Sequence, residues 1–122
     1  MEWKFSGDRP VYQQIQQTLR GAVLKGELLP GQKVPSVREL AAQARVNPNT
    51  VQRALTELEQ EGLLIGCGTS GRTVTTDRQI LESMRRRILM DLARECAETF
   101  RLFGISPTEA GQLLINLEKE NL

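Results

Sequence analysis

Amide and guanidinium side chains cluster on one side of a predicted helix that begins near Asn47. Asn49, Gln52 and Thr56 recur at helical spacing, with Arg53 adjacent to them. Side-chain amides pair bidentately with adenine, and guanidinium groups pair with guanine. A solvated helix face would show the same polarity. The elements that precede this helix favour base recognition in a major groove.

Two short helices joined by a tight turn are predicted to position these groups. Ser36 and Glu39 have the spacing of a capping box, and Pro35 ahead of them ends any upstream helix. Asn47 is the predicted N-cap of the second helix, with Pro48 at its first position. The inward faces are formed by Val37, Leu40, Ala41 and Ala44, and by Val51, Ala54, Leu55 and Leu58.

Further polar residues around this pair of helices are candidate DNA contacts. Arg38 is predicted to bond a phosphate or a guanine, and Ser36 acts mainly as a cap. Thr50 serves equally well as a phosphate donor or as a partner of its own helix. The predicted DNA-binding residues are Ser36, Arg38, Asn47, Asn49, Thr50, Gln52, Arg53, Thr69, Ser70 and Arg72.

The flanking segments predict a winged helix over residues 1–76. A first helix is expected to begin at Pro10 and to end at Gly26, and Trp3 and Phe5 suggest an edge strand or a flap over the core. Strands are predicted at residues 63–65 and 73–75, because β-branched residues flank a glycine-rich turn. The tip of that hairpin, with Thr69, Ser70 and Arg72, would reach the DNA backbone or minor groove, unless the tip is disordered.

Residues 77–122 predict a two-helix tail with a wide apolar stripe. Gly104 separates the helices, and Ser106 with Glu109 repeats the capping pattern. Because so small a tail lacks a core of its own, we expect it to pair with a second chain around a two-fold axis. The predicted dimerisation residues are Leu81, Met84, Ile88, Leu92, Phe100, Leu113, Leu114 and Leu117.

Composition excludes several other classes of protein. The 122 residues contain no His, and Cys67 and Cys96 lack the spacing of a zinc site, so we predict no metal, no cofactor and no catalysis. A redox role for Cys67 is disfavoured, because the flanking sequence offers only one Arg and no His to stabilise a thiolate. The net charge of +1 means that any DNA contact depends on local arrangement. No membrane-length apolar run occurs, so we expect a cytoplasmic protein.

Five motifs in order resemble the N-terminal region of GntR-family transcriptional regulators. They are Pro10-x-Tyr12-x-Gln14-Ile15, Gly26-x-Leu28-x-Pro30-Gly31, Pro35-Ser36-x-Arg38-x-Leu40-Ala41, Thr50-Val51-x-x-Ala54-Leu55-x-x-Leu58 and Glu61-Gly62-Leu63. The short helical tail resembles the YtrA subfamily. Pro48 and Asn49 stand where the family commonly has Ser-Arg, and the wing lacks the usual aromatic and has its basic residue at Arg72. The resemblance implies a winged-helix dimer that binds an operator, usually as a repressor.

These observations predict a mostly α fold with a small β-hairpin, and a homodimer that regulates transcription at a palindromic operator on double-stranded DNA. The alternative is a winged-helix protein-interaction module without DNA binding. Such a module should present large apolar anchors on its outer helix face, whereas this face is polar. A small-molecule effector that binds between the winged helix and the tail, or at the dimer interface, stays open as a further partner.

Overall fold

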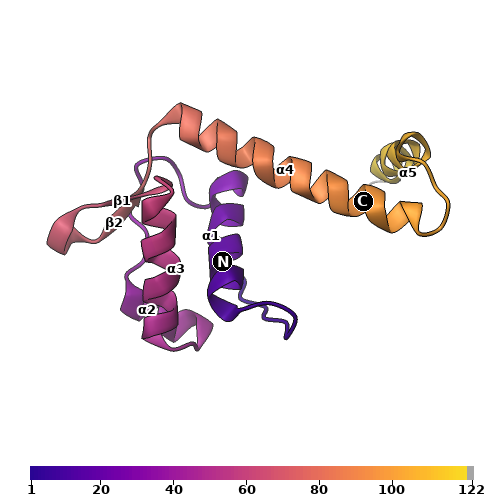
Figure 1. Ribbon diagram of the computed structural model, residues 1–122. Coiled ribbons are helices and arrows are strands. Elements are labelled where there is room, and N and C mark those ends of the chain that lie inside the picture. The colour runs from indigo at the N-terminus through magenta and orange to yellow at the C-terminus, as the bar shows by residue number, and fades with distance from the viewer. Residues whose placement is uncertain (121–122) are drawn as a thin grey trace. The chain divides into compact units, whose positions relative to one another are not determined.

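The computed structural model describes residues 1–120, which form five α-helices and one antiparallel pair of strands (Figure 1). The elements in order are α1 (Val11–Lys25), α2 (Val37–Ala44), α3 (Pro48–Gln60), β1 (Leu64–Gly66), the 3-10 turn η1 (Gly68–Ser70), β2 (Arg72–Val74), α4 (Arg78–Arg101) and α5 (Pro107–Lys119). The chain divides into two compact units, Met1–Glu82 and Ser83–Leu122. None of the described helices is both long and apolar enough to cross a membrane.

Side-chain caps begin the helices at the predicted residues. At α2 the capping box is complete: Glu39 N donates to Ser36 Oγ at 3.1 Å, and Ser36 N donates to Glu39 Oε1 at 3.0 Å. At α3 the Asn49 amide donates to Asn47 Oδ1 at 2.8 Å. At α5 Ser106 is likewise the N-cap. Each cap satisfies a backbone donor that the helix itself leaves without a partner.

Removing the α2 cap should destabilise the first unit. We expect Ser36→Ala to lower the free energy of unfolding by about 1 kcal/mol, because the Glu39 amide loses its acceptor. Urea unfolding followed through Trp3, the single tryptophan, measures this change in the unit that contains α2. The control Ser83→Ala alters an exposed serine inside α4 and should shift the free energy by less than about 0.5 kcal/mol. Equal urea midpoints for the two variants would contradict the assignment.

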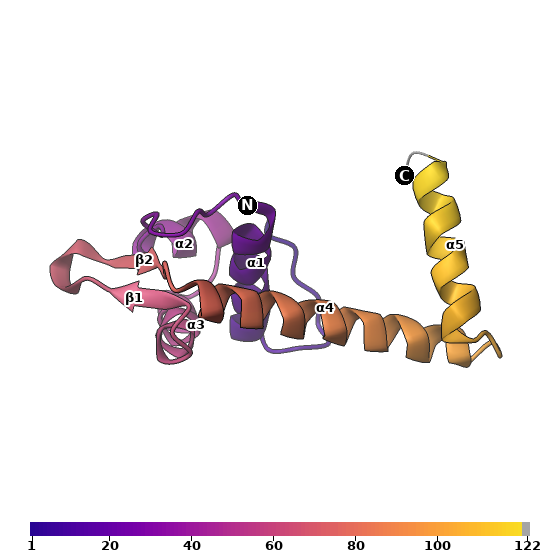
Figure 2. The ribbon, with the colours of Figure 1, turned by 90° about the horizontal axis from the view of Figure 1, so that it is seen from above.

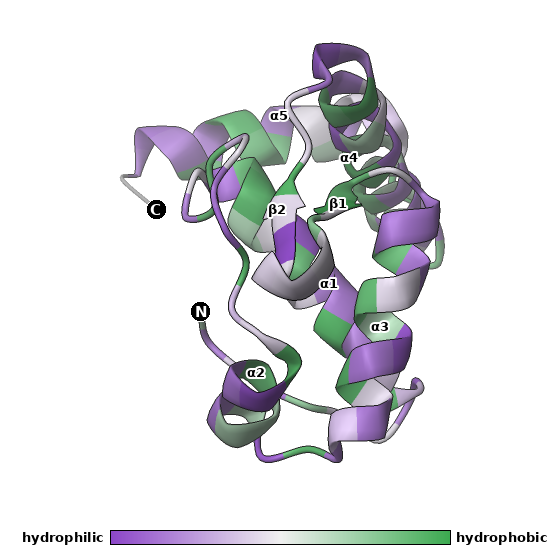
Figure 3. Ribbon diagram, turned by 90° about the vertical axis from the view of Figure 1, so that its left-hand side faces the viewer, coloured by the Kyte–Doolittle hydropathy of each residue, from purple (hydrophilic) through white to green (hydrophobic). Residues whose placement is uncertain are grey.

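The core of the first unit lies where α1, α2 and α3 meet. Ile15, Leu40, Val51 and Leu58 have no exposed surface, and Leu55 is 1% exposed. These residues recur every three or four positions, so each helix turns one apolar stripe inward. Figure 3 shows the consequence on α3, where hydrophobic and hydrophilic residues alternate along the ribbon. Seven of the eight predicted inward residues of α2 and α3 are buried, and Val37, at the start of α2, is half-buried.

The wing is a short hairpin whose strands are displaced by one residue from the predicted ranges. Leu64 pairs with Val74, and Gly66 pairs with Arg72. Leu63 lies outside the strand because its amide closes the end of α3 by donating to the Leu58 carbonyl at 3.1 Å. The second edge of β2 is covered by the segment before α2, since Val34 N donates to Arg72 O at 2.9 Å. The hairpin is thereby attached on both sides to the helix-turn-helix.

The sequence predicted either an edge strand or a flap over the core for the N-terminal arm. The edge strand is not formed. Residues 1–10 contain no strand, and the Trp3 and Phe5 rings stack with their centroids 6.3 Å apart. The buried amide of Gln14 holds the arm instead: it accepts from Ser6 N at 2.8 Å and donates to Arg9 O at 2.7 Å. Pro10 is the N-cap of α1 rather than its first residue. The arm has no strand partner and is held by the Gln14 side chain of α1 and by an ion pair between the Met1 amine and Glu27 at 3.7 Å.

The second unit buries little of its apolar surface. Gly104, with φ of 75°, ends the turn after α4, and α5 then leads away from the end of α4 instead of lying along it (Figure 2). Within the described part of this unit, Met84 and Ala110 are the buried apolar residues. The two predicted helices of the tail are confirmed. The assignment of DNA binding to residues 1–76 and of dimerisation to residues 77–122 stays a prediction.

Candidate nucleic-acid interface

The outer face of α3 carries the predicted base-reading groups. Asn49, Gln52 and Arg53 are exposed, and the opposite face of the helix is buried. Gln52 Nε2 donates to Thr56 Oγ1 at 3.3 Å within the same helix. The first acidic residue of α3 is Glu57, so the N-terminal half of the helix presents no negative side chain. This face can therefore approach a polyanion.

The start of α2 adds a cation beside a capped helix end. Arg38 is exposed, and among residues 1–120 it has no ion-pair partner. Glu39 belongs to the cap: hydrogen bonds from the Ser36 backbone and then its hydroxyl lower the pKa of Glu39 below its ordinary value. The Glu39 carboxylate is thus committed to the Ser36 amide. Arg38 is available for a phosphate or a base.

Two other predicted contacts have partners within the helices. The Asn47 side-chain oxygen is occupied as the α3 cap, and Thr50, one turn into the helix, is half-buried. Their roles toward DNA stay predictions. Arg53 is held on two sides, since its Nε donates to Glu57 Oε2 at 3.2 Å and its guanidinium carbon lies 3.7 Å from the centre of the Tyr12 ring.

Tyr12 is the residue of this surface that sequence reasoning did not assign. It lies in the Pro10-x-Tyr12-x-Gln14 motif, but nothing in that motif indicates which helix the ring contacts. The contact joins residues on α1 and α3 that are far apart in the chain. The motif identifies Tyr12 as a residue of α1. Its contact with Arg53 depends on how α1 packs against α3, which the motif does not specify.

The wing places its polar residues in two different ways. Thr69 and Ser70 lie in η1 at the tip and are exposed, as predicted. The Arg72 side chain is 19% exposed, and its Nε donates to Glu59 Oε1 at 2.8 Å. Gly66 provides room for this pair, because a Cβ there would lie 3.1 Å from the Glu59 carboxylate oxygen. Arg72 therefore fastens the wing to α3, and a DNA contact from it would have to share or replace that ion pair.

The predicted dimerisation residues differ in exposure. Met84 is buried, Leu81, Ile88 and Phe100 are half-buried, and four others are exposed. The exposed four are Leu92 at 50%, Leu113 at 42%, Leu114 at 51% and Leu117 at 40%. Large apolar side chains at this exposure on two successive helices are unusual for a surface that stays in water.

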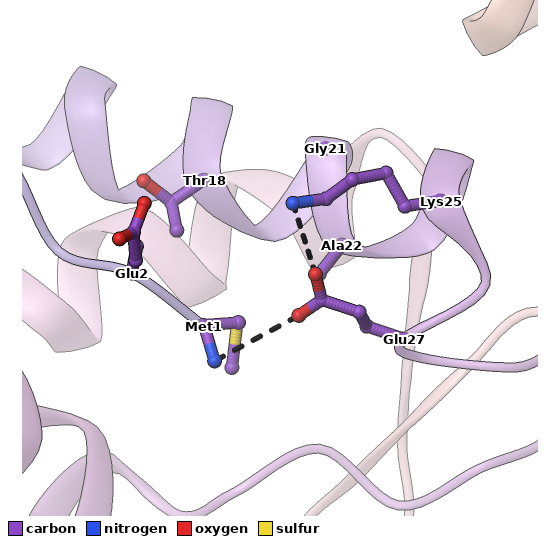
Figure 4. Close-up of a pocket in the computed structure, with 7 residues that line it drawn as sticks. All are labelled: Met1, Glu2, Thr18, Gly21, Ala22, Lys25 and Glu27. Carbon is purple, nitrogen blue, oxygen red and sulfur yellow. Dashed lines mark ion pairs between the residues drawn. The ribbon is translucent and has the colours of Figure 1, made fainter.

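A small surface pocket of about 210 Å³ lies between the N-terminus and the second half of α1 (Figure 4). Glu27 crosses it with two ion pairs, one to Lys25 at 2.9 Å and one to the terminal amine of Met1 at 3.7 Å. The hydrogen bond and the charge of Lys25 lower the pKa of Glu27. Because its charged groups already pair with one another, we assign no ligand to this pocket.

The three-helix core, the capped helix-turn-helix and the attached hairpin define a winged helix-turn-helix protein of the DNA-binding class. The chain belongs to the gntR family of bacterial regulatory proteins, whose model matches residues 11–74. Members of this family are DNA-binding transcriptional regulators and not enzymes, and so is this chain. The resemblance that the motifs indicated is thereby confirmed.

Two bacterial relatives illustrate the family membership. The chain is 30% identical over 109 residues to the HTH-type transcriptional regulator YhcF of Bacillus subtilis, covering 89% of this chain and 90% of YhcF. It is 53% identical over 55 residues to the transcriptional repressor YtrA of the same organism, covering 45% of this chain and 42% of YtrA. With 109 of the 122 residues, the first match reaches into the helical tail, and the second has a higher identity over a shorter stretch.

Solved structures agree with this assignment. A GntR-family transcriptional regulator from Listeria monocytogenes superimposes with a TM-score of 0.82 at 29% identity, covering 94% of this chain and 98% of that one. The DNA-binding domain of AraR in complex with an operator has a TM-score of 0.57 at 30% identity, covering 62% of this chain and 96% of that domain. The likeness to AraR thus concerns a protein that was seen bound to DNA.

Proposed function

We propose that this regulator is a homodimeric repressor that binds a palindromic operator through α3. The observation that carries the proposal is the exposed, non-acidic face of α3, which bears Asn49, Gln52 and Arg53 over a fully buried apolar face. The relative YtrA is named a repressor, and AraR is bound to an operator in its structure. The protein would meet its operator in the cytoplasm.

The proposed division of work follows the position of each group. The first turns of α3 enter the major groove, where Asn49 and Gln52 read base edges. Arg38 and the amides at the start of α2 hold a phosphate, which sets the register of the helix on the duplex. Thr69 and Ser70 reach the flanking backbone from the wing tip. The remaining proposed contacts are Ser36, Asn47, Thr50, Arg53 and Arg72.

The apolar surface of the tail supports the dimer. In the part of the second unit that the structure describes, nine large apolar residues are at least 40% exposed, and they lie on α4, on α5 and in the turn between them. Burying this surface against its copy removes it from water without a new protein partner. A two-fold axis would place the two α3 helices about one helical turn of DNA apart, roughly 34–36 Å. The operator is then palindromic because the dimer is symmetric.

Operator binding by matched variants tests the DNA surface. We expect Gln52→Ala to weaken binding roughly 5- to 150-fold, because a bidentate base contact is lost. Arg38→Ala should weaken binding to all sequences and reduce the slope of log affinity against log salt by about 0.9. Gel-shift titrations on DNA from the protein's own promoter measure both effects.

Gln60→Ala is the control, because Gln60 is exposed at the far end of the same helix. It should bind DNA as the parent does. If Arg38→Ala and Gln52→Ala also bind like the parent, the proposed surface is wrong. A promoter reporter then separates repression from activation: the parent should lower its output, and Gln52→Ala should restore it.

A further inference from the structure

Three polar contacts at regular intervals join α1 to α3 and to Glu61, the C-cap of α3. The Tyr12 ring contacts Arg53, Gln16 Nε2 donates to Glu57 Oε1 at 3.0 Å, and Arg20 Nη2 donates to both Glu61 oxygens at 2.8 Å. Each step advances four residues on both helices, so the two helices run in the same direction along their contact (Figure 1). We call these three pairs the α1–α3 ladder.

The ladder fixes where α3 lies along α1. Its middle pair is the most constrained, because the Gln16 side chain is buried and also donates to the Ala54 carbonyl at 3.2 Å. Its first pair, Tyr12 with Arg53, lies beside the face that carries Asn49 and Gln52. The Arg53 side chain is 60% exposed although it has two partners. This is the one pair of the ladder whose cation belongs to the proposed DNA surface.

Arg53 keeps part of its hydrogen-bonding capacity free. Its Nε is used by Glu57, and one face of its plane lies on the Tyr12 ring. No protein acceptor within residues 1–120 bonds its two terminal nitrogens. Reading a guanine takes two parallel N–H donors from one guanidinium group. A guanidinium held in place before binding loses less side-chain entropy when it makes such a contact.

We propose that Tyr12 is a positioning residue that determines DNA specificity, because its ring holds the terminal nitrogens of Arg53 toward a guanine. This inference rests on the proposed function and assigns α1 a part in base reading. Glu57 is the second support of Arg53. The hydrogen bond from Gln16 lowers the pKa of Glu57, so its carboxylate stays ionised at neutral pH. The ring and the carboxylate together restrict the Arg53 rotamer.

The test measures base preference and not affinity alone. Sequences are selected from random DNA with the parent, Tyr12→Phe, Tyr12→Leu and Arg53→Ala, and then each base pair of the selected site is varied singly. Arg53→Ala should lose the preference for one G·C pair in each half-site. Tyr12→Leu should reduce the same preference about two- to fivefold, the worth of an exposed cation–π contact. Tyr12→Phe, which keeps the ring, should retain it.

The double variant distinguishes positioning from an independent contact. Tyr12→Leu combined with Arg53→Ala should lose no more preference at that base pair than Arg53→Ala loses alone. If Tyr12→Leu instead weakens binding equally to every sequence, or if Tyr12→Phe behaves like Tyr12→Leu, the ring does not position Arg53 and the proposal is overturned. Tyr12→Met replaces Tyr12→Leu if circular dichroism shows that the leucine variant is unfolded, since methionine adapts to irregular packing.

A measurement without DNA separates this inference from the proposed function. In the free protein the Tyr12 ring current should move the Arg53 Nε–H proton resonance upfield, in the parent and in Tyr12→Phe but not in Tyr12→Leu. Absence of that shift in the parent overturns the inference even if operator binding is normal. A parent protein that shows the shift but selects no DNA sequence overturns the proposed function, and the specificity role of Tyr12 with it.

Discussion

Leu114→Glu is expected to convert the proposed dimer into a monomer and to weaken operator binding roughly 10²- to 10⁴-fold. In the single chain Leu114 is 51% exposed, so a glutamate there is compatible with a folded α5. In a dimer the same position would be enclosed by the partner's tail, where an unpaired carboxylate is costly. A monomer binds one half-site and loses the effective concentration that links the second half-site to the first.

Sedimentation equilibrium measures the mass, and fluorescence anisotropy with a two-half-site duplex measures the affinity. Gln112→Glu is the matched control, because it adds the same charge to an exposed position of the same helix. It should remain dimeric and keep the parent affinity. A dimeric Leu114→Glu variant would show that this part of α5 lies outside the interface. A monomeric parent would remove the dimer from the proposal altogether.

Leu58→Ala is expected to lower the free energy of unfolding of the first unit by about 2–5 kcal/mol. The Leu58 side chain has no exposed surface, and the close-packed core around it can collapse only partly into the space that the truncation leaves. DNA binding should fall in parallel, because α3 depends on that core for its position. The loss is large beside the total stability of a small domain.

Urea unfolding followed through Trp3 measures this loss in the unit that contains Leu58. Leu29→Ala is the control: it makes the same chemical change at a leucine that is 57% exposed in the same unit. Its free energy of unfolding should stay within about 0.5 kcal/mol of the parent value. Similar losses for both leucines would mean that the α3 core is not packed as described.

The secondary structure was predicted from sequence where local chemistry decides it. Ser36, Asn47 and Ser106 begin the helices at which they were predicted as caps, because a cap needs a side chain and an amide two or three residues away. The wing strands were displaced by one residue. The Leu63 amide donates to the Leu58 carbonyl at 3.1 Å at the end of α3, and β1 therefore begins one residue later, at Leu64.

The candidate site was predicted as a set of residue types on one helix face, and the exposure of Asn49, Gln52 and Arg53 agrees with that pattern. The spacing of polar residues could not indicate which of these side chains have partners within the protein. Arg72 was predicted at the wing tip from its place beside the glycine-rich turn, yet its side chain pairs with Glu59, thirteen residues earlier in the chain. Periodicity describes one element at a time and contains no information about the distance between two elements.

Order along the chain was sufficient for the helix-turn-helix, its caps, the hairpin and the amphipathic tail, because each depends on residues within about one or two turns of each other. The packing of α1 on α3 was needed to place Tyr12 against Arg53, residues 41 positions apart. The same packing buries Gln16, which is 5% exposed. Ile15 on α1 and Leu55 and Leu58 on α3 are buried together, and this shared apolar core brings the distant segments into contact. No short stretch of sequence contains all of these residues, so none specifies the contact.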